Sequence, residues 1–473
     1  MKIAKLIIVS ATAVSLVVSG CNKKLELAPG DSLPTSTALG TLKGINAAMV
    51  GMYAQLRGVN YYGRGFFIYG DLSADDVYLS KANSNRFLST FQRNYAANDA
   101  DMLGLWAAMY AAIAQSNNIL QAVDKITATD QEKNAIKGQA LFVRALAYFD
   151  LVRVFAKPYN QGGGSQAGVP LVLIADVAAM PGRKTVGEVY TQIIKDLTDA
   201  KGLLAKTTED TKLTASKYAA AALLSRVYLY KEDYPNVIAQ ANEVTAAGYA
   251  LVDPAALTGF YTSTENSEEI FTVKVNAVES LGSNNLGNMY LKAGYGDIRV
   301  SPDLVNAFDK TNDLRYRLFI VPFPGIPSEF QNNKFTGQDN TLGMYSAKVL
   351  RLPEVLFNRA EAYAKTGKNG EAMADLNAVR QERGLAAVSG LSGDVLVNEV
   401  LAEKRREFMF EGFRFFDLTR TGKGVQRNYC NQITQVTVPK CTLPANDPKA
   451  IAPIPQAEID ANPGLKGQQN QDY

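Results

Sequence analysis

The sequence predicts a mainly α-helical protein: a tetratricopeptide-like scaffold of helical repeats with long irregular loops and a few short strands. Apolar residues recur at three- and four-residue spacings along several long stretches, as they do on one face of a helix. In three of these stretches a small residue precedes a tyrosine by three positions. A small residue lets two antiparallel helices approach closely while the tyrosine fills the space beside it, which is typical of tetratricopeptide units.

The N-terminus has the pattern of a bacterial lipoprotein signal. Lys2 and Lys5 precede an apolar run that ends in Ser19-Gly20-Cys21. The run has about 13 residues, whereas a membrane-spanning helix needs about 20. We therefore predict a signal peptide over residues 1–20 and lipidation of Cys21, with an ordinary secretory signal as the alternative. Residues 21–40 are rich in Pro, Gly, Ser and Thr and are predicted to form a tether.

Composition excludes several classes of function. The chain contains no histidine, so it has no Ser-His-Asp or Cys-His nucleophile system and no histidine-ligated zinc. Loss of residues 1–20 with Lys2 and Lys5 lowers the formal net charge from +3 to +1, and no segment concentrates Lys and Arg, so no nucleic-acid partner is expected. No pattern indicates a cofactor, and no Asp/Glu spacing resembles a calcium loop.

Helical periodicity first appears after the tether, and residues 41–250 are predicted as the N-terminal helical part. An apolar stripe runs from Leu42 to Leu56, and others follow over residues 103–123 and 132–155. Trp106, the only tryptophan, is expected to pack in the core.

The repeat pattern continues along the chain. Ser225 and Tyr228 mark one unit, Ala360 and Tyr363 a second. Ala145 and Tyr148 start a third unit. Its partner helix is expected at residues 185–204, after an inserted loop over residues 157–169 that contains Pro158 and the glycines at positions 162–164. Helix pairs of this kind stack into a curved scaffold.

Residues 251–473 are predicted as a loop-rich C-terminal part. Residues 249–335 are rich in Asn, Gly, Ser and aromatic residues, with one expected strand at 269–275. Cys430 and Cys441 are close in sequence and lie beyond the reducing cytoplasm if the signal is correct, so we predict a structural disulfide between them.

The C-terminal blocks carry a family resemblance. Residues 351–385 read RLPEVLFNRAEAYAKTGKNGEAMADLNAVRQERGL, and residues 399–424 read EVLAEKRREFMFEGFRFFDLTRTGKG. Together they resemble the signature of the SusD/RagB family of Bacteroidetes outer-membrane lipoproteins, and further landmarks, among them residues 70–76 and 454–456, extend the similarity over nearly the whole chain after the signal. The resemblance implies a SusD-like fold and a non-enzymatic role: capture of an oligosaccharide, or in some members a peptide, for a partner SusC-like TonB-dependent transporter.

Two clusters of residues are candidates for ligand contact. Aromatic faces can stack on sugar rings, and carboxylates, amides and guanidinium groups can hydrogen-bond to hydroxyls. The first cluster lies around residues 61–78, with Arg86 and Asn94 nearby in sequence, and the second lies around residues 284–299, beginning at Asn284. From them the predicted ligand-binding residues are Tyr62, Asp75, Asp76, Tyr78, Tyr290, Tyr295 and Arg299. Packing in the core is the competing interpretation for each aromatic residue.

Glu407 and Glu411 lie four residues apart on a predicted helix and resemble a glycosidase carboxylate pair. Arginines surround them in sequence and would keep both carboxylates ionised, so structural ion pairing is the favoured interpretation. A lipid-anchored carboxylate glycosidase and a purely structural repeat adaptor remain as alternatives to a nutrient-binding lipoprotein.

Overall fold

The computed structural model describes residues 35–176, 178–204, 212–263, 267–430, 436–437 and 440–473. The predicted signal peptide, Cys21 and residues 21–34 of the tether lie outside the described residues. Within the described ranges the chain is mainly helical and its strands are short, which confirms the predicted fold class. None of the helices in these ranges combines the length and the apolar character needed to cross a membrane.

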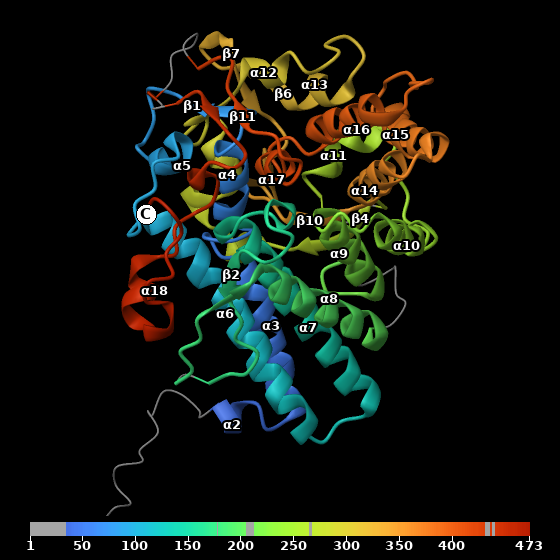
Figure 1. Cartoon of the computed structure of the whole chain (residues 1–473). Coiled ribbons are helices and arrows are strands. Elements are labelled where there is room, and N and C mark those ends of the chain that lie inside the picture. The colour runs from blue at the N-terminus through green and yellow to red at the C-terminus, as the bar shows by residue number, and fades with distance from the viewer. Residues whose placement is uncertain (1–34, 177, 205–211, 264–266, 431–435, 438–439) are drawn as a thin grey trace, which may run out of the picture.

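A continuous series of packed helices forms the scaffold (Figure 1). Each helix packs against the next, in the order α3 (Leu42–Leu56), α6 (Ala100–Ala122), α7 (Asp130–Phe155), α8 (Val186–Leu203), α9 (Lys217–Tyr230), α10 (Tyr234–Thr245) and α14 (Leu352–Lys365). Helices α15 (Asn369–Glu382) and α16 (Gly393–Glu407) then pack against α14. The three predicted repeat units correspond to the pairs α7–α8, α9–α10 and α14–α15.

Local sequence fixes where two of these helices begin. Thr129 and Glu132 form a capping box at the start of α7, and Thr185 and Glu188 form one at the start of α8. In each box the threonine side chain accepts from a free backbone N–H of the first turn, and the glutamate accepts from the threonine N–H. The start of α8 thus lies within one residue of its predicted position.

The C-terminal half contains more strand than the sequence predicted. The expected strand is β4 (Glu269–Val273), which pairs with β10 (Ala347–Arg351). In addition, an antiparallel sheet has the strand order β1 (Val77–Leu79), β5 (Ile298–Val300), β7 (Ile326–Asn332) and β6 (Ile320–Phe323). Strands β1 and β5 have only three residues each, all buried, which is too few for an alternating pattern to be recognised in the sequence.

Shorter elements complete the fold. The remaining α-helices are α2 (Thr35–Ala38), α4 (Gly65–Leu72), α5 (Leu88–Gln92), α11 (Leu257–Phe260), α12 (Pro302–Val305), α13 (Leu314–Phe319), α17 (Arg414–Arg420) and α18 (Gln456–Ala461). The remaining strands are β2 (Ala167–Pro170), β3 (Arg183–Thr185), β8 (Gly337–Gln338), β9 (Thr341–Leu342), β11 (Val425–Gln426) and β12 (Thr442–Leu443). Short 3-10 helices are η1 (Val123–Lys125), η2 (Tyr159–Gln161), η3 (Pro254–Ala256), η4 (Ala277–Glu279), η5 (Gly282–Asn284), η6 (Leu286–Met289), η7 (Pro448–Ala450) and η8 (Pro463–Leu465).

Helix α4 lies against the turn that follows α16, and this contact joins the two halves of the chain. A Cβ atom at Gly70 would come within 2.1 Å of the carbonyl oxygen of Gly412, so the helix can approach only because residue 70 is glycine. The carboxylate of Asp71 accepts hydrogen bonds from the Gly412 N–H at 2.9 Å and from the Tyr290 hydroxyl at 2.8 Å. Burial raises the pKa of Asp71 to about 8, against the opposing effect of these two hydrogen bonds.

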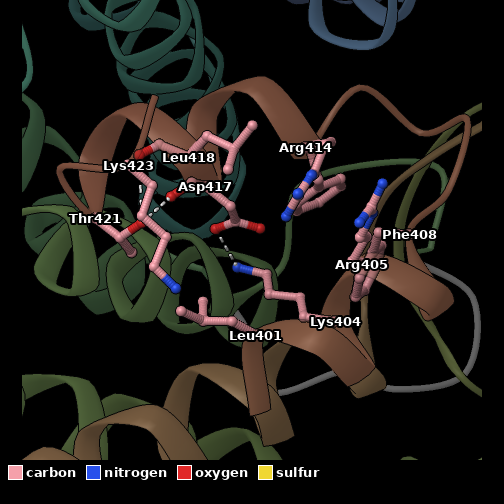
Figure 2. Close-up of a pocket in the computed structure, with 10 residues that line it drawn as sticks. Leu401, Lys404, Arg405, Phe408, Arg414, Asp417, Leu418, Thr421 and Lys423 are labelled. Atoms are coloured by element: carbon pink, nitrogen blue, oxygen red, sulfur yellow. Dashed lines mark hydrogen bonds and ion pairs between the residues drawn. The ribbon is translucent and has the colours of Figure 1, made fainter. Parts of the chain in front are cut away.

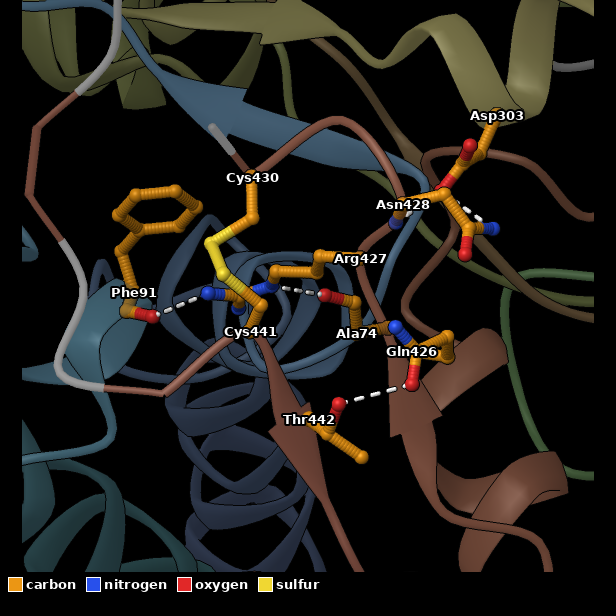
Figure 3. Close-up of a disulfide and its surroundings, with 9 residues drawn as sticks. All are labelled: Ala74, Phe91, Asp303, Gln426, Arg427, Asn428, Cys430, Cys441 and Thr442. Atoms are coloured by element: carbon orange, nitrogen blue, oxygen red, sulfur yellow. Dashed lines mark hydrogen bonds between the residues drawn. A yellow bond between two sulfur atoms is a disulfide. The ribbon is translucent and has the colours of Figure 1, made fainter. Parts of the chain in front are cut away.

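One arginine attaches a C-terminal segment to the N-terminal half, and a disulfide lies within that segment (Figure 3). The buried guanidinium of Arg427 donates to the carbonyl oxygens of Leu72, Ala74 and Phe91 at 2.6, 2.9 and 2.7 Å. Close by, the structure joins Cys430 and Cys441 in a disulfide with a Cα–Cα distance of 5.6 Å. Arg427 therefore connects the segment between α4 and α5 to the end of the chain.

Candidate functional site

Six of the seven predicted ligand-binding residues are buried and bonded inside the protein. Tyr62 is one of them: it and Tyr61 both donate to Asp150 at 2.6 Å, and their rings stack with centroids 4.4 Å apart. Asp150 in turn pairs with Arg153. Tyr62 therefore belongs to a core cluster beneath α4 and not to a surface site.

The two predicted acidic residues act in ion pairs. Asp75 accepts from Nε and Nη2 of Arg414 at 2.7 and 2.8 Å, and Asp76 accepts from Nε of Arg405 at 2.7 Å. These bonds connect the turn after α4 to α16 and α17. Two of the arginines near Glu407 in sequence, Arg405 and Arg414, thus bind Asp76 and Asp75, pairings across more than three hundred residues that the sequence could not indicate.

The remaining buried members lie in or beside the four-stranded sheet. Tyr78 pairs with Arg299 in the register of β1 and β5, and both are less than 5% exposed. Arg299 donates to Glu329 at 3.0 Å and lies over the ring of Phe323. Tyr290 is fully buried and donates to Asp71. We therefore reassign Tyr62, Asp75, Asp76, Tyr78, Tyr290 and Arg299 to the framework that supports a site.

Tyr295 is the predicted member that reaches the surface, with 36% of its area exposed. Its ring lies against Arg86, whose Cζ atom is 3.9 Å from the ring centroid, and Arg86 Nη2 donates to the tyrosine hydroxyl at 2.9 Å. Hydrogen bonds with Ser283 and Arg86 lower the pKa of Tyr295. The two clusters predicted from sequence therefore meet at this pair, although 209 positions separate the residues.

The loop before α5 holds Arg86 in place. Arg86 Nη1 donates to the hydroxyl of Ser84 at 2.9 Å, and Ser84 donates through its hydroxyl and its backbone N–H to Asp297. Asn85 and Phe87 both have positive φ angles, 61° and 58°, a conformation that is uncommon outside glycine. Because the residue on each side of Arg86 has a left-handed backbone conformation, the contacts of this loop must determine its shape.

Arg64, which sequence reasoning missed, extends the site toward a small hollow. It donates through Nη1 to Asn284 Oδ1 at 2.7 Å, and its Cζ atom lies 5.0 Å from the ring centroid of Phe87. The hollow is also lined by Asn60, Thr90 and Asp101. The position of Arg64 within the aromatic-rich stretch of residues 61–69 was the one available signal, and the aromatic residues themselves are buried in the core. We call Arg64, Arg86, Asn284 and Tyr295 the arginine–tyrosine site.

A second hollow lies between α16 and α17 (Figure 2). Its charged side chains are taken up by internal ion pairs: Lys404 donates to Asp417 at 3.1 Å, while Arg405 and Arg414 bind Asp76 and Asp75. It opens beside a polar groove of about 330 Å³ that includes Glu361, and this carboxylate is bound by both terminal nitrogens of Arg420 at 2.7 Å. These pairs leave few polar groups free for a ligand, so the arginine–tyrosine site is the stronger candidate.

Glu407 and Glu411 lie in a buried network of ion pairs, as the sequence interpretation favoured. Glu407 binds Arg351 and Arg383, and Glu411 binds Arg351 and Lys334. Burial alone would raise the pKa of Glu407, but the neighbouring arginines outweigh burial and hold it well below its usual range. Such a carboxylate is ionised at neutral pH and cannot serve as the general acid of a glycosidase.

Comparisons with known proteins agree with this architecture. Residues 25–229 match the family described as "Starch-binding associating with outer membrane", and residues 326–473 match the SusD family. A SusD-like protein of Formosa agariphila, P38, is 23% identical over 481 residues, covering 87% of this chain and 90% of the relative. A SusD-like protein of Bacteroides ovatus is 24% identical and covers 88% of this chain and 82% of the relative.

Solved structures show the same fold. The crystal structure of a putative sugar-binding protein from Bacteroides vulgatus has a TM-score of 0.83 and 28% identity, covering 92% of this chain and 99% of that one. A SusD superfamily protein from Bacteroides thetaiotaomicron has a TM-score of 0.82 and 27% identity, covering 91% and 99%. The two matches cover residues 25–229 and 326–473, so the chain belongs to the SusD/RagB family, one of whose models is described as starch-binding and associated with the outer membrane.

Proposed function

We propose that this protein is a lipid-anchored, surface-facing outer-membrane protein that binds an oligosaccharide and passes it to a partner SusC-like TonB-dependent transporter. Family membership supports carbohydrate binding and a location at the outer membrane, and the lipoprotein signal at residues 1–21 supports a lipid anchor. The single observation that carries the binding role is the arginine–tyrosine site, because it offers an exposed aromatic ring next to hydrogen-bonding side chains.

The chemistry of this site suits a sugar. The accessible part of the Tyr295 ring can stack on the C–H face of a pyranose, while Arg86 and Asn284 can bond to hydroxyls at its edge. The loop contacts through Ser84 and Asp297 hold Arg86 before a ligand arrives, so little side-chain entropy is lost on binding.

Ligand binding is tested by calorimetric titration of the mature protein with panels of oligosaccharides and of peptides. For a glycan that binds, Tyr295→Ala should weaken affinity about tenfold, which corresponds to roughly 1.4 kcal/mol of lost stacking and hydrogen bonding. Tyr363→Ala is the matched control, since Tyr363 is a partly exposed tyrosine that also has a cation, Lys368, over its ring. Binding of peptides alone, or equal affinity of Tyr295→Ala and the parent protein, would contradict the proposal.

Delivery and anchoring need a separate experiment in the native host. A C-terminal affinity tag should recover a large outer-membrane barrel protein together with this chain from solubilised membranes. Cys21→Ala should release the protein from the membrane fraction, because the acyl chains supply the attachment. Recovery without a barrel partner argues against delivery, and membrane attachment of Cys21→Ala argues against the lipid anchor.

A further inference from the structure

The arginine–tyrosine site brings together two guanidinium groups that do not bind a carboxylate. Arg86 bonds to the hydroxyls of Ser84 and Tyr295, and Arg64 bonds to the amide of Asn284. Within the described part of the chain, neither side chain forms an ion pair. The two arginines are close enough for their charges to repel, and both interact electrostatically with Tyr295.

Arg64 differs in this respect from most other buried arginines of the protein. It is 9% exposed, yet its Nε atom is buried and lacks a hydrogen-bond partner among the described residues. By contrast, Arg144 binds both oxygens of Asp196, and Arg226 binds both oxygens of Glu354. A buried charge without a counter-ion is costly unless hydrogen bonds satisfy its donors, as three backbone carbonyls do for Arg427, whereas Arg64 keeps a buried Nε without a partner in the described part of the chain.

The surroundings of Arg64 leave its charge poorly compensated. Burial lowers its pKa, and Arg86 lowers it further, while Asp101 acts in the opposite direction. Asp101 lines the same hollow, but it forms no ion pair with Arg64 among the described contacts. The other carboxylate near the site, Asp297, is engaged by the hydroxyl and the backbone N–H of Ser84, which stands between it and Arg86.

We propose that the ligand of this site is an acidic oligosaccharide whose sugar carboxylate binds to the Arg64–Arg86 pair while the sugar ring rests on Tyr295. This inference rests on the proposed oligosaccharide-binding function and specifies its ligand class. A planar guanidinium offers two parallel N–H groups that match a carboxylate, and such charge-assisted bonds are about twice as strong as neutral ones. Hydroxyls of a neutral glycan would leave the positive charge of Arg64 uncompensated.

The test compares acidic oligosaccharides with their neutral counterparts. Oligogalacturonate, glucuronate-bearing xylan fragments and alginate oligomers are titrated calorimetrically against the same oligomers after methyl esterification of their carboxyl groups. At least one acidic oligomer should bind tenfold or more tightly than its ester, and the difference should shrink as NaCl is raised, because salt screens exposed charges.

Variants then test whether the arginine–tyrosine site causes the preference for the acidic oligomer. Arg86→Gln and Arg64→Gln should bring the affinity for the acid close to that for the ester, whereas Tyr295→Ala should weaken both by a similar factor. Lys195→Gln on α8 is the control for the loss of one positive charge, because Lys195 is an exposed residue that pairs with Asp199 on its own helix. Arg86 is half-buried at the surface, so Arg86→Gln tests the proposal even if Arg64→Gln fails to fold.

The outcomes separate this inference from the proposed function. Equal binding of acids and esters, or tight binding of neutral glycans alone, overturns the acidic ligand and leaves oligosaccharide binding intact. A preference for the acid that survives Arg86→Gln overturns the assignment to this site. If neither these oligomers nor the wider panel of glycans binds, the proposed function itself fails.

Discussion

Arg427 binds three backbone carbonyls of the N-terminal half with one side chain. Its guanidinium donates to the carbonyl oxygens of Leu72, Ala74 and Phe91, and its Cζ atom lies 4.4 Å from the centroid of the Phe91 ring. Arg427→Met should lower the free energy of unfolding by at least about 3 kcal/mol, because buried carbonyls lose charged donors worth roughly 1.5 to 3 kcal/mol each. Urea denaturation measures the change, and Arg317→Met, at an exposed arginine of α13, should have almost no effect. An equally small effect of both variants would show that the three carbonyls do not need Arg427.

The sequence identified the regions of the candidate site but not the side chains that face solvent. Tyr295, Arg86 and Asn284 all lay in the two clusters that its aromatic and polar residues indicated. Whether a tyrosine is exposed depends on segments far away: Tyr290 is buried against Asp71, 219 positions distant, while Tyr295 meets Arg86 at the surface. Residue type and local spacing carry no information about such pairings, which is why six predicted contacts proved to be internal.

Helix α4 and the turn at Gly412 show how closely two elements approach at the junction of the two halves. A methyl group at Gly70 would lie 2.1, 2.6 and 2.7 Å from the O, C and Cα atoms of Gly412. All three are backbone atoms, so the clash cannot be relieved by turning a side chain. Gly70→Ala should therefore destabilise the protein by about 2 kcal/mol or more, since overpacking of a rigid core usually costs about 1 to 3 kcal/mol.

Gly202, near the end of α8, is the matched control for that change. A methyl group there would meet no atom within 4 Å. Because alanine favours a helix over glycine by up to about 1 kcal/mol, Gly202→Ala should leave stability unchanged or raise it. Thermal unfolding of both variants measures the pair. A stable Gly70→Ala protein would contradict the close approach of α4 to the turn.

The segment after Arg427 depends on a covalent link as well. The disulfide closes a loop between residues 430 and 441, and the chain-entropy model gives a loop of that length about 3 kcal/mol of stabilisation. Replacing both cysteines with serine should lower the melting temperature in oxidising buffer. Adding dithiothreitol should lower the melting temperature of the parent protein toward that of the double variant and leave the variant unchanged. A reductant effect of equal size in both proteins would show that the link contributes nothing.

At the level of elements, the sequence predicted long helices better than strands. Helices α3, α6, α7 and α8 carry apolar residues over three or more turns, so their periodicity is readable, and capping boxes mark the starts of two of them. Strands β1 and β5 are too short for any periodicity, and they pair across more than two hundred residues. The sequence therefore failed to predict this sheet because its strands pair across long distances in the chain, and not because their local sequence is unusual.

A buried network of ion pairs joins distant elements into one body. Glu268, Glu407 and Glu411 bind Arg351 at the end of β10, and Glu268 and Glu407 also bind Arg383 after α15. Glu403 and Glu407 extend the network from α16 to Arg315 on α13. Single groups in such a network cannot lose their charge without leaving buried partners unpaired, so the whole molecule should respond to acid as a unit.

Glu403 sets the pH range of that response. Burial raises its pKa, but Arg315 and Arg406 outweigh burial and lower it from 4.5 to about 2. The carboxylate of Glu403 is therefore protonated near pH 4.5 in the unfolded chain but only near pH 2 in the folded protein. Its contribution to stability is fully present above pH 4.5 and is lost as the pH falls from 4.5 to about 2. This one group should account for about 3 kcal/mol of the free energy of unfolding, at about 1.4 kcal/mol per pKa unit.

Urea denaturation from pH 6 down to pH 3 should show midpoints that fall steeply below about pH 5. Glu403→Gln should be less stable than the parent protein at pH 6 and should lose less stability on acidification, whereas Asp394→Asn, at an exposed carboxylate of α16, should follow the parent curve. Parallel curves for the parent protein and Glu403→Gln would show that the charge of Glu403 does not stabilise the fold.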